Sequence, residues 1–119
     1  MNYIFGITMT DDLILNDKER EFIRREFRAL LNEAPSVHDG FRLKRWATGP
    51  NKGKVKLSTA VQGMLERGLI SFEDVGFWPT AKFTEKGLQA LKLMAADRRA
   101  FDPARYQQLI DELARVPDL

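Results

Sequence analysis

The sequence contains no cysteine and a single histidine, His38. Without cysteine, neither a disulfide framework nor a thiolate metal site can form. His38 stands next to Asp39, but adjacent residues rarely point at each other, and no serine or cysteine nucleophile is marked beside them. The acidic pair Asp11 and Asp12 is more typical of a turn than of a metal site. We therefore expect no metal, no cofactor and no enzymatic activity.

Long apolar runs are also missing, since no stretch approaches the length needed to cross a bilayer. The opening residues, MNYIFGITMTDDLIL, carry no basic region and reach two aspartates too early for a signal peptide. The lack of cysteine fits a reducing compartment. We expect a cytoplasmic protein with no membrane partner.

The residues that are present indicate one soluble globular domain, spanning residues 1–119. Hydrophobic residues make up 44% of the chain and charged residues 30%. The net charge is only +2, but residues 41–67 hold seven cations against the single acid Glu66, a local balance of +6. The other residues hold 12 of the 19 cations and 16 of the 17 acids. A basic middle between acidic flanks favours a surface that meets phosphate, although a solvated lysine-rich loop would give the same pattern.

Capping signals predict the first helix. Asn16 is a good N-cap, and Glu19 stands three residues later as its capping partner. An apolar stripe follows, and Pro35 is predicted to end the helix near Glu33. Before it, residues 1–15 are predicted to form a strand or arm that turns at its two aspartates.

The stretch after this helix is the least regular. Phe41, Leu43 and Trp46 are predicted to anchor a short strand or a helical turn. The glycines and proline of residues 48–54 indicate a loop. This loop partly matches a phosphate-binding loop, but its spacing is one residue short and Val55 replaces the hydroxyl residue that would hold magnesium, so we reject a nucleotide site.

A second helix is predicted from the Ser58 cap to about Arg67, where Gly68 ends it. Gly63 in its middle costs about 1 kcal/mol relative to alanine, which suggests the close approach of another backbone, from DNA or from this fold. The inward face is apolar and the outward face polar, with Leu57, Val61, Met64 and Leu65 inward and Thr59, Gln62, Gly63 and Glu66 outward.

The following residues predict a β-hairpin. The β-type runs 69–72 and 77–83 are joined by turn residues at 73–76. Pro79 restricts the second run to the edge of a sheet.

Two more helices are predicted after the hairpin. Thr84 caps one that runs to about Arg99, and Asp102 with Pro103 begins another over residues 103–116. The apolar stripe of the last helix would join two chains in a homodimer if the domain's own core does not use it. The stripe consists of Tyr106, Leu109, Ile110 and Leu113.

Three pieces of sequence occur in a characteristic order: Leu57-Ser58-Thr59-Ala60-Val61, then Leu65-Glu66-Arg67-Gly68-Leu69-Ile70, then Phe83-Thr84-Glu85-Lys86-Gly87-Leu88. Together they resemble the winged-helix DNA-binding domain, and most closely the MarR-like bacterial regulators, over residues 57–95. The resemblance implies an α+β fold, a mainly helical winged helix-turn-helix with a small antiparallel β-hairpin wing. It also implies that the first two pieces are a recognition helix leading into the wing, and the third the return strand and next helix. Two features depart from that family: a glycine-containing loop stands where it has a helix before the recognition helix, and the wing turn is acidic.

The predicted function is DNA binding by a transcriptional regulator or accessory factor that meets double-stranded DNA. The basic segment 42–56 and the helix 58–67 are the predicted interface. Candidate contacts to phosphate are cationic, and those to base edges are polar and uncharged. The first set is Arg42, Lys44, Arg45, Lys52, Lys54, Lys56 and Arg67, and the second is Ser58, Thr59 and Gln62.

Ordinary structural roles could also explain several of these residues. The cap explains Ser58 fully, and a solvated helix face would explain the residues after it. Trp46 is expected in the core, because a small chain needs its large aromatics inside, whereas Trp78 is the better candidate for an exposed aromatic. The alternative function is a protein–protein interaction module on the same fold, using Trp78, Phe77 and the acidic wing tip.

Overall fold

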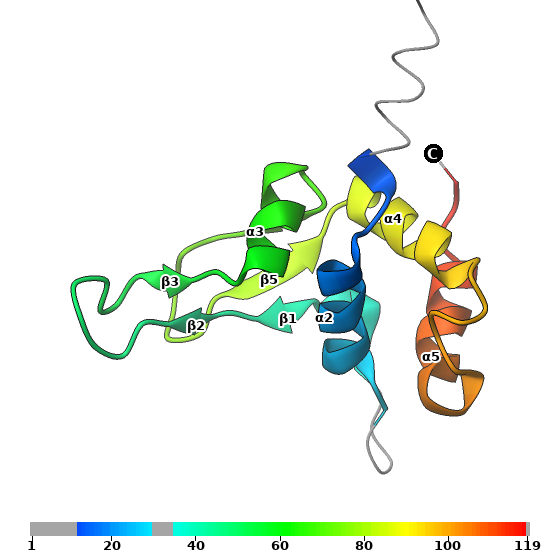
Figure 1. Ribbon diagram of the computed structural model, residues 1–119, viewed down its shortest axis with the longest axis horizontal. Coiled ribbons are helices and arrows are strands. Elements are labelled where there is room, and N and C mark those ends of the chain that lie inside the picture. The colour runs from blue at the N-terminus through cyan, green and yellow to red at the C-terminus, as the bar shows by residue number, and fades with distance from the viewer. Residues whose placement is uncertain (1–11, 30–34, 119) are drawn as a thin grey trace, which may run out of the picture.

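The computed structural model describes residues 12–29 and 35–118, which form four α-helices and two small antiparallel sheets (Figure 1). The α+β prediction is confirmed at this level. In chain order the elements are α2 (Asp17–Phe27), the 3-10 helix η1 (Val37–Asp39), β1 (Phe41–Arg42), β2 (Lys44–Arg45), β3 (Val55–Lys56), α3 (Thr59–Glu66), β4 (Ile70–Phe72), β5 (Thr80–Phe83), α4 (Glu85–Ala95) and α5 (Pro103–Ala114).

Most of the strand or arm predicted for residues 1–15 lies outside the described residues. Asp12 and Leu13 are helical, where a turn and a second apolar segment were predicted. The carbonyls of Asp12 and Ile14 both accept hydrogen bonds from Arg67, at 3.1 Å each. These bonds hold the segment against the end of α3, a contact that local turn propensity does not reveal.

The capping box of α2 is confirmed. Glu19 N donates to Asn16 Oδ1 at 2.9 Å, and Asn16 N donates to Glu19 Oε1 at 3.0 Å. The helix ends at Phe27, six residues before the predicted end, where the backbone becomes extended at Arg28. Ala29 N then donates to a carbonyl of α5 at 3.1 Å, so a tertiary contact takes the place of another helical turn.

The predicted helix–hairpin–helix order is confirmed. α3 begins at its Ser58 cap and ends before Gly68, whose φ of 73° lies in the left-handed region. β4 and β5 then pair antiparallel, with Ile70 opposite Phe83, and α4 follows directly after the Thr84 cap. Residues 57–95 thus have the succession of elements that their sequence predicted.

The prediction that Pro79 confines its strand to an edge is wrong, because β5 lies between β1 and β4. Pro79 stands just before the strand and does not enter the ladder, so its missing N–H costs no ladder bond. Its carbonyl accepts a 2.7 Å hydrogen bond from Leu43 N. Pro79 therefore anchors the residue that leads from β1 into β2.

Close packing ties α4 to the turn after α3. Thr84 Oγ1 donates to Gly68 O at 2.6 Å and accepts from Gly87 N at 3.0 Å. A Cβ on Gly87 would lie 1.9 Å from Leu69 O, so no larger residue fits there without moving the helix. This contact explains both the Thr84 cap and the glycine three residues after it.

The α4 helix ends at Ala95, four residues before the predicted end. Asp97 starts a turn there, because its carboxylate accepts a 3.0 Å hydrogen bond from Arg99 N. That bond and the charge of Arg99 lower the pKa of Asp97 from its ordinary value, assisted by Arg20, against an opposing contribution from burial.

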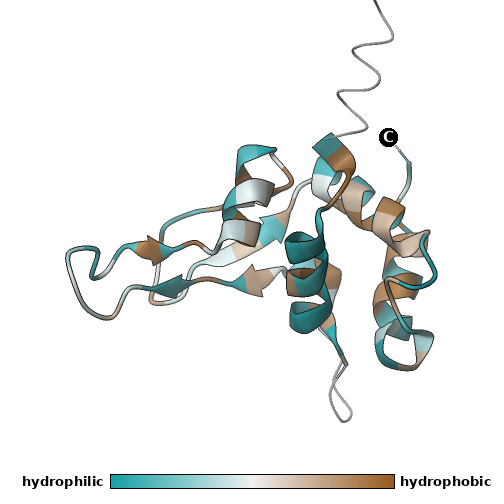
Figure 2. Cartoon of the chain, viewed as in Figure 1, coloured by the Kyte–Doolittle hydropathy of each residue, from teal (hydrophilic) through white to brown (hydrophobic). Residues whose placement is uncertain are grey.

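The apolar stripe of α5 belongs to the chain's own core. Tyr106, Leu109 and Leu113 are buried, and Ile110 packs against the same cluster. Tyr106 also donates its hydroxyl to the Arg24 carbonyl of α2 at 2.8 Å. Figure 2 shows hydrophobic residues along α4 and on part of α5, whereas the visible side of α2 is mainly hydrophilic. The premise of the predicted homodimer, a free stripe on α5, is therefore not met.

Candidate nucleic-acid interface

Residues 44–56 form a two-stranded projection that we call the basic arm. β2 and β3 pair antiparallel, and the predicted loop 48–54 closes their far end. Trp46 N donates to Lys54 O, and Gly53 N donates to Trp46 O, both at 2.9 Å, which extends the pairing beyond the strands. Figure 1 shows the arm reaching away from α4 and α5. A β-ribbon thus stands directly before α3, where the MarR-like resemblance implies a helix.

Lysines face each other across the arm. Lys44 pairs with Lys56 in the antiparallel register, so the two side chains share one face. Like charges directly opposite each other destabilise a β-ladder. Lys56 Nζ lies 4.7 Å from the ring centroid of Trp46, a cation–π contact. Lys52 and Lys54 add two exposed cations at the tip.

Arg45 acts as a brace, although the sequence predicted it as a phosphate contact. Its NH2 group lies 2.7 Å from Asp74 Oδ1, and the same nitrogen donates to Gly76 O at 2.7 Å. Its NH1 group donates to Gly53 O in the arm at 2.9 Å. Arg45 therefore joins the arm to residues 73–79, which we call the β4–β5 loop, and neutralises one of that loop's two acids.

Three large aromatic side chains are exposed beside these cations. Phe77 is 78% exposed, Trp78 53% and Trp46 41%, so the prediction that Trp46 lies in the core is wrong and that of an exposed Trp78 is confirmed. The rings of Phe77 and Trp78 meet edge to face at 5.1 Å, and Arg42 Cζ lies 5.9 Å from the Trp78 centroid.

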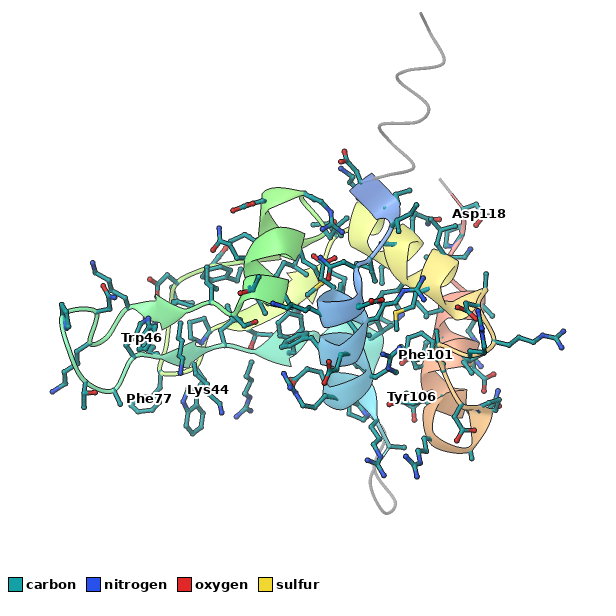
Figure 3. The ribbon with its side chains drawn as sticks, viewed as in Figure 1. Lys44, Trp46, Phe77, Phe101, Tyr106 and Asp118 are labelled. Carbon is teal, nitrogen blue, oxygen red and sulfur yellow. The ribbon has the colours of Figure 1, made fainter. Side chains whose placement is uncertain are left out.

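These aromatics line an open groove of about 780 Å³ between the arm and the β4–β5 loop. We call it the aromatic groove. Figure 3 shows Lys44, Trp46 and Phe77 gathered at this side of the molecule, far from Phe101 and Tyr106 among the helices. The cationic and aromatic side chains that line the groove include Arg42, Lys44, Lys52, Trp46, Phe77 and Trp78.

The outward face of α3 offers less to DNA than its sequence predicted. Thr59 and Gln62 are exposed, as expected. The Ser58 hydroxyl, however, accepts the capping bond from Val61 N at 3.3 Å, and Gln62 Nε2 donates to Glu66 Oε1 at 2.9 Å. The exposed carboxylate of Glu66 would also face the phosphates of a duplex laid on this helix.

Arg67 has a structural role in place of the predicted phosphate contact. Its NH1 and NH2 groups lie 2.8 and 3.1 Å from the two carboxylate oxygens of Glu19, a side chain with no exposed surface. A Cβ on Gly63 would lie 2.7 Å from Glu19 Oε2. The close approach predicted at Gly63 therefore comes from this fold, and from a carboxylate rather than a backbone.

Sequence reasoning missed two features of this surface. Phe77 was named only as a possible protein contact, although among the described residues it is the most exposed of the large aromatics. The Arg45–Asp74 pair joins residues that are distant in sequence and carries no local signal. The one signal of the groove in the sequence was the presence of Trp46 within the basic segment 42–56.

Within residues 12–29 and 35–118, no three side chains of the metal-binding types gather at one place. No helix in the same ranges has the length and apolar character to cross a membrane.

Comparisons of the chain with protein-family models, with curated proteins and with solved structures found no match. The function of the chain is therefore inferred from the residues and geometry of the arm and the groove.

Proposed function

We propose that this chain is a non-enzymatic nucleic-acid-binding protein that holds DNA phosphates with its basic arm. The observation that carries the proposal is the exposed Lys44–Lys56 pair, with two further lysines at the arm's tip. A phosphate bound between the paired lysines would relieve their mutual repulsion. Side chains of this kind supply affinity without reading sequence.

The proposal includes a winged-helix fold and a role in transcription regulation, because residues 57–95 resemble the winged-helix domain of MarR-like regulators. The passage from α3 through Gly68 into the β4–β5 hairpin and α4 supports the fold. The arm occupies the place of the helix that normally precedes the recognition helix. We assign the principal DNA contact to the arm, because the polar groups of α3 are partly used within the helix and Glu66 is negative.

Salt dependence tests the proposal. Fluorescence anisotropy with a mixed-sequence DNA duplex should show binding that weakens steeply between about 50 and 200 mM salt, as counterion release requires. The double variant K52A/K54A should weaken binding to every sequence alike and flatten the salt slope by about 1 for each lost contact.

The control is R98A/R99A, which removes the same charge from exposed residues in the turn between α4 and α5. It should leave both affinity and slope close to the wild-type values. A wild-type protein that binds no DNA even at low salt, or a control that matches K52A/K54A, would overturn the proposal.

A second candidate is a protein-interaction module, favoured by the exposure of Val75, Phe77 and Trp78. This function predicts a partner whose binding depends on Phe77 and Trp78 and changes little with salt. K52A/K54A would leave such binding intact, which separates it from the proposal above.

A further inference from the structure

The aromatic groove has features that contact with phosphate alone does not require. A chain of this size normally needs its large aromatics in the core, yet Trp46, Phe77 and Trp78 are each exposed by 41% or more. They come from two segments distant in sequence and line one groove. Clustered exposed apolar side chains of this kind mark a binding surface.

Charge complementarity indicates what occupies the groove. Arg42 lies over Trp78 and Lys56 over Trp46, so each tryptophan has a cation at its side. Arg42 lines the groove together with Lys44 and Lys52, against the acid Glu26. An uncharged apolar peptide would leave this excess positive charge without a partner. A polyanion with flat apolar groups satisfies both the cations and the rings.

Nucleic acid has that chemistry, but only unpaired bases can use the rings. In a duplex the bases are stacked inside and present their edges, so an aromatic side chain cannot stack on them without unpairing. A single strand can turn its bases outward onto aromatic rings while its backbone follows a basic surface. The groove of about 780 Å³ falls in the range of sites that hold a small ligand, which suits individual bases rather than a whole duplex.

We propose that the aromatic groove binds unpaired bases of single-stranded nucleic acid, with Trp46, Phe77 and Trp78 as the stacking surface. The inference rests on the proposed function, because the arm lysines hold the same strand by its phosphates. The protein would then bind single-stranded DNA or RNA more tightly than a duplex, because a duplex offers the arm its phosphates but offers the groove no unpaired bases.

The test uses the full chain with four labelled probes: a 12-nucleotide dT strand, a 12-nucleotide U strand, a 12-nucleotide dA strand and a blunt mixed-sequence duplex. Anisotropy gives affinity, and intrinsic tryptophan fluorescence reports stacking at the groove. We expect the single strands to quench this fluorescence and to bind about tenfold or more tightly than the duplex, since stacking contributes severalfold to a hundredfold per base.

Variants separate stacking from charge. F77A/W78A removes two exposed side chains and should lower single-strand affinity by about tenfold or more, with duplex affinity unchanged. K52A/K54A should weaken both kinds of probe alike. The control is L93A, which removes an exposed apolar side chain of α4 outside the groove and should change neither affinity. Thermal unfolding confirms that each variant is folded.

The outcomes distinguish the two proposals. Equal binding of single strand and duplex, with F77A/W78A like wild type, overturns the stacking inference and leaves phosphate binding by the arm in place. Failure of every probe at low salt overturns both. A preference between the U strand and the dT strand supports direct contact with the nucleotides, at the 2′-hydroxyl or at the thymine methyl group, because the two strands differ in both.

Discussion

Glu19 is a carboxylate with no exposed surface, and its bonds join the start of α2 to the residue that follows α3. It accepts from Asn16 N at the start of α2 and from both terminal nitrogens of Arg67 after α3. Arg67 in turn donates to the carbonyls of Asp12 and Ile14. A buried charge is tolerated only when it is paired and hydrogen-bonded, and here a single arginine supplies the pairing.

Replacing Arg67 by alanine should therefore lower the free energy of unfolding by about 3 kcal/mol, the cost of leaving a buried charge without its partner. Urea unfolding measures this loss. Arg67→Lys should fall between alanine and wild type, because lysine keeps the charge but loses the two-pronged geometry. At a temperature where R67A is folded, the salt slope for DNA should equal that of wild type. A slope reduced by about 1 would restore Arg67 to the phosphate contacts.

Local signals in the sequence were sufficient for the starts of the helices and for the end of α3 at Gly68, and insufficient for the ends of α2 and α4. The caps at Asn16, Ser58 and Thr84 were each predicted, because a cap is a bond between residues three apart. The end of α2 at Phe27 was not, since the Ala29 N–H finds its partner on α5. Distant partners of this kind leave no trace in a short window of sequence.

The candidate site was predictable in its charge and not in its shape. The excess of cations in residues 41–67 predicted the stretch of chain that carries the exposed arm lysines. Arg45 and Arg67 carry the same charge as those lysines but bond within the fold to Asp74 and Glu19. Which cations remain free depends on where distant acids lie, and sequence order does not give that.

The arm depends on Arg45 for its position. The guanidinium bonds to Gly53 within the arm and to Gly76 and Asp74 in the β4–β5 loop. A two-stranded ribbon is marginally stable by itself, so contacts of this kind decide whether it holds one conformation. The brace also fixes one wall of the aromatic groove relative to the other.

The variant R45A should loosen the arm without unfolding the domain. We expect amide hydrogen exchange at Trp46 and Gly53, whose N–H groups bond across the ribbon, to accelerate by about tenfold or more, as one to two lost hydrogen bonds imply. Exchange in α4 should stay as in wild type. K52A is the control, because it removes an exposed cation at the tip of the arm without touching the brace or the Lys44–Lys56 pair. Unchanged exchange at Trp46 in R45A would contradict this role.

The last helix, α5, closes the core. Its buried side chains pack in the same cluster as those of α2 and α4. Hydrogen bonds reinforce the packing, since Glu112 accepts from Val37 N at 3.0 Å and the Tyr106 hydroxyl reaches α2. The helix thus connects η1 and α2, segments well before it in the sequence. The sequence showed the apolar stripe but could not say whether the same chain or a second one covers it.

The structure assigns that stripe to the chain's own core, and a concentration series tests the assignment. Leu109→Ala should lower the free energy of unfolding by about 2–5 kcal/mol, because a fully buried leucine leaves a cavity behind. For wild type and variant alike, Tm should stay constant over about two decades of protein concentration, since unfolding then involves one chain. Leu93→Ala, an exposed position on α4, is the control and should change stability by less than about 0.5 kcal/mol. If the stripe instead joined two chains, Tm would rise with concentration in the wild type, and Leu109→Ala would reduce or abolish that rise.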